Sequence, residues 1–293
     1  MTRLTISICT RNRENDLEKC LYSLSNQDIS ATNSIEVLIV DDGELTIDFL
    51  NISKKLLDKF EFNYYKKIQA GLYLSRIKSV ELAKGAVILF LDDDVVLEKD
   101  YLKILLDTYE HNKDIVGLGG IDMLLPKYSF LRDIYTTLFL YNSQNIGKLS
   151  LTGLNSSMNR WQSQKNIFES EYLYGCNMSF RKDIITKLPS IEFFNNYSLG
   201  EDLFISLFAN KYGKILVNPK LKVEHFQTPI SRDKVENVSK MKVINHYKML
   251  PYLNSSKVKY IFIYWTYTGM VLASLLKFNL KELKGYINGI KLI

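Results

Sequence analysis

Three consecutive carboxylates, Asp92-Asp93-Asp94, directly follow an apolar run and are the sharpest chemical signal in the sequence. Alternate side chains along an extended backbone point the same way, so Asp92 and Asp94 can face one site while Asp93 faces away. Like charges this close repel one another, which favours a bound counter-cation. Carboxylate oxygens suit Mg²⁺ or Mn²⁺ bridging to phosphate oxygens. The competing interpretation is a solvated acidic turn.

A second acidic pair, Asp41-Asp42, follows the apolar run of residues 35–40 and is itself followed by Gly43. A simple turn is one interpretation, because Asp and Gly are favoured in turns. Polar residues at the ends of buried parallel strands also lie where α/β sheets bind ligands. The two acidic pairs together favour a site for nucleotide phosphates.

Three further residues could take part in this chemistry. Asp202, just before a helical pattern, is either a helix N-cap or a general base for a hydroxyl nucleophile. Arg76, in a helical pattern after Gly71, is either solvated or the charge partner of a diphosphate. His225 follows a short strand pattern, and a solitary histidine is more often structural than a ligand.

Strands and helices must alternate to position these residues. Apolar runs predict strands at 4–9, 35–40 and 86–91, and helical spacing predicts helices at 15–24, 49–57, 72–83, 101–109 and 203–208. Residues 121–172 are irregular and rich in aromatic residues, Asn and Ser, as expected of a part that shapes the substrate site. A strand pattern returns at 174–181, and a short strand is expected at 214–217. This alternation predicts an α/β fold with a largely parallel sheet.

The composition excludes several classes of protein. With 46% apolar and 24% charged residues over 293 positions, the chain is typical of a globular protein. Three scattered cysteines exclude a disulfide scaffold and are expected to be reduced thiols, and no secretory signal pattern opens the chain, which predicts a cytoplasmic location. The net charge of +6 is unevenly distributed: residues 226–293 carry +8 and residues 1–225 carry −2. The near-neutral main part and the lack of a nucleic-acid motif argue against nucleic-acid binding.

The basic tail has a pattern of its own. Residues 260–276 contain no charge and many aromatic residues, but fall short of the roughly 20 apolar residues that a spanning helix needs. A single helical stripe follows, with lysines mainly off it, formed by Leu276, Leu280, Leu283, Ile287 and Ile290. The pattern predicts peripheral contact with an anionic membrane. A packing helix and an oligomer interface are the alternatives.

In their order along the chain, these motifs resemble the family 2 inverting glycosyltransferases, which have the GT-A fold. The resemblance covers about residues 2–226 and rests on the segments 7–12, 37–43, 71–76, 90–94, 175–181 and 200–202. One departure is Ser75-Arg76-Ile77, where many members have Ala-Arg-Asn. The resemblance implies a nucleotide-sugar-binding, Rossmann-like mixed sheet flanked by helices. The expected domains are residues 1–226, with a nucleotide-binding half (1–120) and an acceptor half (121–226), and a helical tail (227–293).

The resemblance also implies roles for individual residues. Asp202 would be the catalytic base, and Asp94 and His225 would hold a divalent metal, Mn²⁺ or Mg²⁺. The nucleotide-diphosphate contacts would come from Thr10, Arg11, Asp42, Arg76, Asp92 and Asp93. Contacts to the donor sugar or the acceptor would come from Gly175, Cys176, Asn177 and Glu201.

The predicted function is therefore metal-dependent transfer of a sugar from a nucleotide-diphosphate donor, with a UDP-sugar favoured, to a glycan or lipid-linked glycan. Bacterial surface polysaccharide synthesis at the inner face of the cell membrane is the expected setting, and an oligomer is compatible with the sequence. The alternative is a nucleotidyltransferase or another metal-dependent nucleotide-sugar enzyme. Nucleotidyltransferases usually present a glycine-rich loop near the N-terminus, whereas Cys9-Thr10-Arg11-Asn12 contains no glycine. A non-catalytic binder that uses the basic tail is the third hypothesis.

Overall fold

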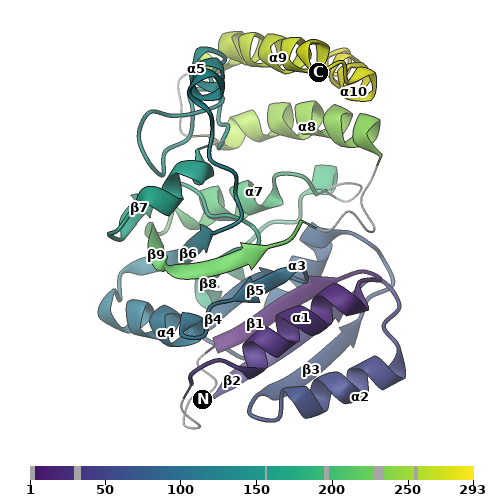
Figure 1. The fold of residues 1–293 in the computed structure, drawn as a ribbon, viewed down its shortest axis with the longest axis vertical. Coiled ribbons are helices and arrows are strands. Elements are labelled where there is room, and N and C mark those ends of the chain that lie inside the picture. Colours follow the sequence, from purple (N-terminus) through teal and green to yellow (C-terminus); the bar gives the residue numbers. More distant parts are fainter. Residues whose placement is uncertain (1–3, 30–33, 156, 195–197, 228–233, 254–256) are drawn as a thin grey trace.

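The computed structural model describes residues 4–29, 34–155, 157–194, 198–227, 234–253 and 257–293. Its centre is one mixed sheet with the strand order β3-β2-β1-β4-β8-β6-β9-β5, and β7 pairs with β9. Helices pack against this sheet, and a layer of helices that includes the C-terminal ones forms the upper end of the molecule (Figure 1). The predicted α/β class is confirmed.

The first half of the sheet is parallel and collects the acidic residues at one edge. It consists of β1 (Leu4–Thr10), β2 (Ile35–Asp41), β3 (Glu61–Lys66) and β4 (Val87–Asp92), connected through α1 (Glu14–Ser25), α2 (Ile47–Leu56) and α3 (Leu72–Leu82). In the register, Thr10 lies opposite Asp41 and Cys9 lies opposite Asp92. The carboxyl ends of these strands therefore meet, as the two acidic pairs predicted.

The second half of the sheet is largely antiparallel, so the prediction of a largely parallel sheet is wrong there. β8 (Asn177–Arg181) runs antiparallel to both β4 and β6 (Ile115–Asp122). β9 (Lys214–His225) is parallel to β6 but antiparallel to β5 (Val95–Leu97) and β7 (Phe168–Ser170). β8 starts at the edge where β4 ends, so it must run in the opposite direction.

β9 is longer than the strand predicted at 214–217, because it continues past a register shift in its pairing with β6. The extension pairs with β5 and places His225 opposite Val95, the residue after the three acids. α4 (Tyr101–His111) covers the sheet nearby. The sheet therefore brings His225 to Asp94 although 131 positions separate them in the chain.

The upper helical layer contains α5 (Phe130–Leu138), α8 (Val235–Met249), α9 (Lys259–Leu276) and α10 (Leu280–Ile290). α5 lies in the segment expected to be irregular, and a turn divides the predicted apolar stripe between α9 and α10. The remaining short elements are η1 (Met158–Ser163), α6 (Lys182–Ile185), η2 (Glu192–Phe194), α7 (Glu201–Ala209) and η3 (Leu250–Tyr252). Among the helices of the described ranges, none combines the length and hydropathy that a membrane-crossing segment needs. The division at residue 226 stays a prediction.

Candidate active site

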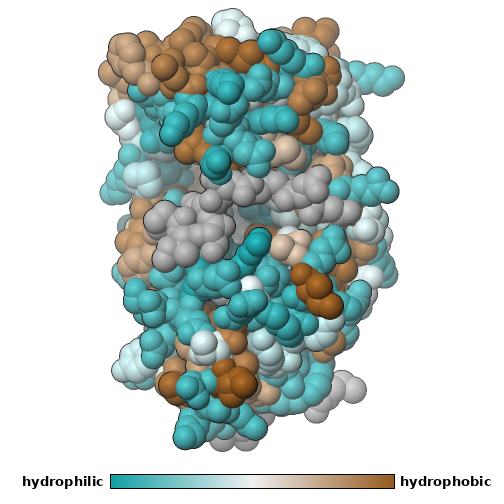
Figure 2. Space-filling view, turned by 90° about the vertical axis from the view of Figure 1, so that its right-hand side faces the viewer, coloured by the Kyte–Doolittle hydropathy of each residue, from teal (hydrophilic) through white to brown (hydrophobic). Residues whose placement is uncertain are grey.

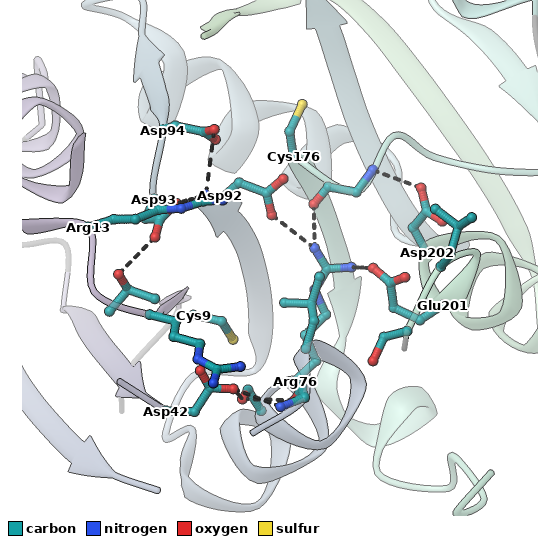
Figure 3. A pocket seen from close by; sticks show the side chains of 18 of the residues that line it. Cys9, Arg13, Asp42, Arg76, Asp92, Asp93, Asp94, Cys176, Glu201 and Asp202 are labelled. Carbon is teal, nitrogen blue, oxygen red and sulfur yellow. Dashed lines mark hydrogen bonds and ion pairs between the residues drawn. The ribbon is translucent and has the colours of Figure 1, made fainter. Parts of the chain in front are cut away.

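A cavity of about 430 Å³ opens where β1, β2 and β4 end, between α3 and the start of α7. Figure 3 shows that the acidic strand ends and the start of α7 face each other across it. Predicted site residues that line it are Thr10, Arg11, Asp42, Arg76, Asp92, Asp93, Asp94, Gly175, Cys176, Glu201, Asp202 and His225. The fold therefore gathers residues from seven separate segments of the sequence into one place.

Asp92, Asp94 and His225 form a group that could hold a metal, since one ligand atom from each lies within 4.8 Å of the others. His225 Nε2 is 3.1 Å from Asp94 Oδ1 and 3.8 Å from Asp92 Oδ2. Burial lowers the pKa of His225, but the hydrogen bond to Asp94 and the surrounding carboxylate charges outweigh burial and raise it. The carboxylates around His225 therefore favour a positive charge beside them. A divalent cation bound to Asp92, Asp94 and His225 would supply that charge in place of a proton on the imidazole. Carboxylate ligands suit Mg²⁺ and Mn²⁺, and imidazole is a common ligand of transition metals.

Asp93 points away from this group, as the alternation along the strand predicted. Its carboxylate accepts hydrogen bonds from Thr10 Oγ1 at 2.8 Å and from Arg13 Nη1 at 2.9 Å. Burial raises the pKa of Asp93 to about 6, although Arg13 and Thr10 act in the opposite direction. Arg13 also lies 3.7 Å from Asp94, so it screens two of the three neighbouring acids. The sequence interpretation missed Arg13, although it lies directly after Arg11 and Asn12.

Two further side chains position the His225 ring and were not predicted. Asp122 Oδ1 accepts a hydrogen bond from the His225 backbone N–H at 3.2 Å, and its Oδ2 is 3.8 Å from Nδ1. The Tyr174 hydroxyl lies 3.3 Å from the same Nδ1. Such partners commonly orient a metal-binding histidine. A signal for Asp122 exists, because it ends an apolar run just as Asp41 and Asp92 do.

Arg76 lines the cavity, but its guanidinium group is also engaged within the protein. The side chain is only 2% exposed, and both of its terminal nitrogens are engaged within the protein. Nη1 donates to Glu201 at 2.8 Å, and Nη2 donates to Asp92 at 3.1 Å and to the Gly175 carbonyl at 2.8 Å (Figure 3). Arg76 therefore ties the end of β4, the loop before β8 and the start of α7 into one unit.

Asp202 faces the cavity from the first turn of α7. Gly200 is the N-cap of this helix, so the N-cap interpretation of Asp202 is wrong. Its Oδ1 accepts from the Leu203 N–H at 2.8 Å and its Oδ2 from the Gly175 N–H at 3.3 Å. A β-carbon at Gly175 would lie 3.1 Å from the Asp202 β-carbon, so glycine lets the loop approach closely. Burial raises the pKa of Asp202, against the lowering effect of the Arg76 charge, which makes the carboxylate a stronger base.

The neighbouring acids Asp41 and Asp42 have different roles, one in the turn after β2 and one in the cavity. Asp41 is fully buried and accepts from the Gly43 N–H at 2.7 Å, which fixes the turn after β2. Asp42 reaches the cavity, and its Oδ2 accepts from the Gly71 N–H at 2.8 Å, at the start of α3. Arg11 is exposed at the cavity wall.

Among the predicted sugar contacts, the position of Asn177 differs most from the prediction. It is fully buried at the start of β8, and its Oδ1 accepts from the Gly120 N–H of β6 at 3.4 Å. It is not among the residues that line the cavity. The neighbouring Cys176 does line it, and burial raises the pKa of its thiol well above the ordinary value. All three cysteines are free, as predicted.

Comparison with known proteins decides the family. Residues 5–166 match glycosyl transferase family 2. The chain belongs to this family. A curated relative, the glucosyl-dolichyl phosphate glucuronosyltransferase of Haloferax volcanii, is 25% identical over 195 residues, which are 64% of this chain. The match covers 55% of that relative, so this family 2 chain corresponds to about half of its length.

Solved structures resemble this family 2 protein along nearly its whole length. The Staphylococcus aureus TarS crystal structure with UDP-GlcNAc has a TM-score of 0.57 at 17% identity, covering 98% of this chain and 79% of that one. The Pyrobaculum calidifontis mannosyltransferase PcManGT, in complex with GDP-Man and Mn²⁺, has a TM-score of 0.59 at 14% identity. That match covers 99% of this chain and 74% of the other. The predicted GT-A fold and membership of glycosyl transferase family 2 are confirmed.

Proposed function

We propose that this protein is an inverting glycosyltransferase that transfers a sugar from a nucleotide-diphosphate donor to a hydroxyl group, with the help of a divalent cation. The observation that carries the proposal is the composition of a single cavity: the Asp92–Asp94–His225 group lies on one wall and the Asp202 carboxylate on another. One wall suits a diphosphate with its cation, and the other suits a nucleophile that must lose a proton. Family membership favours this reaction over nucleotidyl transfer.

Each residue has a distinct part in the proposed reaction. When bound by Asp92, Asp94 and His225, Mn²⁺ or Mg²⁺ would neutralise charge on the diphosphate leaving group. Asp202 takes the proton from the acceptor hydroxyl as its oxygen bonds to the anomeric carbon. The bond from that carbon to the phosphate oxygen breaks, its electron pair stays with the diphosphate, and the single displacement inverts the configuration.

The remaining predicted residues are proposed to position the substrates. Arg11 and Asp42 are available to the base and ribose of the donor, because both line the cavity. Thr10, Arg76 and Asp93 support the site through the contacts described above rather than by direct phosphate binding. Glu201 acts through Arg76, whereas Gly175 and Cys176 form the wall nearest the sugar.

A lipid-linked glycan is the proposed acceptor, and bacterial surface polysaccharide synthesis at the inner face of the cell membrane is the proposed setting. The Haloferax relative supports the acceptor class, since its name describes transfer to a sugar on dolichyl phosphate. A UDP-sugar is the proposed donor, with a GDP-sugar as the alternative, because solved structural neighbours were crystallised with one or the other. The basic tail, residues 227–293, is proposed to contact the membrane peripherally.

We expect Mn²⁺ to be required for tight donor binding, because the acidic group otherwise repels the diphosphate. Titration calorimetry with a panel of UDP- and GDP-sugars should show binding in Mn²⁺ that weakens at least about tenfold in EDTA or in Asp94→Asn. Asp107→Asn, an exposed change on α4, is the matched control and should bind as the wild type. Equal donor affinity with Mn²⁺ and with EDTA would exclude the metal role.

A further inference from the structure

Hydrophobic side chains gather at the upper end of the molecule, where α5, α9 and α10 lie (Figures 1 and 2). α9 buries one side against the other helices and turns the opposite side outward, exposing Ile261, Trp265, Leu272, Leu275 and Leu276. No Asp, Glu, Lys or Arg occurs between Lys259 and Lys277. Apolar faces of this kind mark interaction sites on proteins in water.

α5 extends this outward apolar face, although it precedes α9 by more than 120 residues in the chain. Trp265 Nε1 donates to the Leu138 carbonyl at 2.8 Å, and the Trp265 ring stacks on Phe139 with 4.9 Å between centroids. The Tyr135 hydroxyl donates to the Gly269 carbonyl at 2.6 Å. These contacts hold the two helices together while leaving exposed, on α5, Phe130, Leu131, Ile134 and Leu138.

The turn between α9 and α10 also exposes its apolar side chains. Leu276, Phe278 and Leu280 are 73%, 90% and 72% exposed. Phe278 has a φ of 52°, in the left-handed region that glycine adopts most easily after a helix. The turn is well held, since the N–H groups of Phe278 and Asn279 donate to Leu275 and Ser274 at 3.0 Å each. An aromatic residue at a position suited to glycine, with its ring in water, contributes little to folding and is available for a partner.

Charge identifies the chemistry of that partner. Exposed lysines accompany the apolar face beyond both ends of α9 and along α10: Lys257, Lys277, Lys281, Lys284 and Lys291. Lys284 also pairs with Glu236 at 3.1 Å. Aromatic and aliphatic side chains enter the interface of a bilayer while lysines meet anionic head groups. A second copy of this chain fits less well, because a symmetric contact would bring the same lysines against each other.

We propose that α5, α9 and the turn at residues 276–280 form a single docking surface for an anionic lipid bilayer. The surface extends beyond the tail contact predicted from sequence, because α5 belongs to the segment between the nucleotide half and the active-site loop. The docking surface therefore forms only when the protein folds and α5 comes to lie beside the tail helices. The link to a lipid-linked acceptor rests on the proposed function.

The docking surface lies close to the cavity through α8, which packs beneath α9 (Figure 1). Asn245 of α8 donates to the carbonyl of Leu199, a residue that lines the cavity, at 3.0 Å. A bilayer on the outer face of α9 would thus be separated from the cavity by α9 and α8. This arrangement suits an acceptor whose lipid stays in the bilayer while its sugar enters the cavity.

The variant Phe278→Gly distinguishes a loss of membrane docking from a loss of stability. Glycine adopts the left-handed backbone without strain, so we expect the melting temperature to stay the same or rise. Flotation with vesicles of phosphatidylglycerol and phosphatidylcholine should show at least a tenfold weaker association than the wild type. Ile47→Ser, which removes a largely exposed apolar side chain from α2, is the matched control and should float as the wild type.

Two further variants test the composition of the surface. Leu131→Ser on α5 leaves the tail intact and should also weaken flotation. The double variant Lys277→Glu, Lys281→Glu should lose the preference for anionic over neutral vesicles. Unchanged flotation of Phe278→Gly and Leu131→Ser would overturn the proposal, as would a wild-type protein that does not float with anionic vesicles. A dimer in solution that Phe278→Gly converts to a monomer would instead assign this surface to a second copy.

Asp202→Asn separates this proposal from the proposed function. That substitution lies in the cavity, so its flotation should equal that of the wild type even when sugar transfer is lost. Conversely, Phe278→Gly should bind a soluble nucleotide sugar with unchanged affinity. A failure of docking is thereby distinguishable from a failure of the catalytic assignment.

Discussion

Replacing Asp202 with asparagine is expected to lower kcat for sugar transfer by about 10²–10⁴-fold, the range that a positioned general base contributes. Asparagine keeps the size of the side chain but cannot take the proton from an acceptor hydroxyl. Donor affinity should change by no more than a few-fold, since Asp202 is outside the Asp92–Asp94–His225 group. The expected signature is therefore a fall in kcat with little change in the dissociation constant of the donor.

The measurement pairs a steady-state assay of sugar transfer with calorimetry of donor binding. Asp107→Asn, which makes the same chemical change on an exposed face of α4, should retain wild-type kcat. Asparagine has a single acceptor oxygen, so one of the two N–H groups of Leu203 and Gly175 loses its acceptor. Circular dichroism and a melting curve should therefore accompany the assay. Wild-type kcat in Asp202→Asn would disprove its role as the base.

Replacing Arg76 with alanine is expected to lower the free energy of unfolding by about 3–5 kcal/mol, as is typical when one partner of a buried ion pair is removed. Arg76 is nearly fully buried, and its loss leaves Glu201 without its cation at 2.8 Å and Asp92 without its partner at 3.1 Å. The Gly175 carbonyl also loses a donor at 2.8 Å. Arg76→Lys should recover only part of the loss, because an ammonium group cannot reproduce the planar fork of donors.

Urea unfolding measures this effect, and a double-mutant cycle assigns it. Lys19→Ala, which removes an exposed lysine 3.9 Å from the partly buried Asp16, should change the free energy of unfolding by less than about 1 kcal/mol. In the cycle, Arg76→Met combined with Glu201→Gln should be less destabilised than the sum of the single changes, since neither charge is then left buried alone. Additive effects in this cycle would show that the two side chains are not energetically coupled.

The chemical core of the site is predictable from the sequence because short-range patterns encode it. Apolar runs that end in Asp41 and Asp92 predict buried parallel strands, and parallel strands bring their carboxyl ends to one edge. Alternation along an extended chain then separates Asp93 from its neighbours, as the structure shows. Asp42 and Asp202 reach the same cavity as the acidic strand end, in agreement with the segments that carried the family resemblance.

Long-range pairing explains what the sequence interpretation missed. The direction of β8 and the extension of β9 depend on which strands they join, and no local pattern records this. The partners of Arg76 are equally hidden, because Glu201 is 125 positions away. A buried arginine and a solvated one look the same in a helical pattern, so only the fold distinguishes phosphate binding from an internal ion pair.

The C-terminal tail and α5 also have features that local sequence patterns do not reveal. The uncharged aromatic segment of the tail, residues 260–276, lies within α9, in the tail that was predicted to be helical. Phe278 interrupts the predicted stripe through a backbone conformation that the hydrophobic pattern does not reveal. α5 was not expected at all, since it lies in a segment where aromatic and polar residues mask the helical spacing.

The most direct test of the proposed reaction identifies the leaving group. Phosphorus NMR would follow the purified protein with Mn²⁺, a panel of UDP- and GDP-sugars, and lipid-linked glycans extracted from membranes. We expect the nucleoside diphosphate to accumulate in step with glycosylated product, and to be absent when EDTA replaces Mn²⁺. Release of pyrophosphate or of a sugar phosphate, with no nucleoside diphosphate, would contradict the assignment of this cavity to glycosyl transfer.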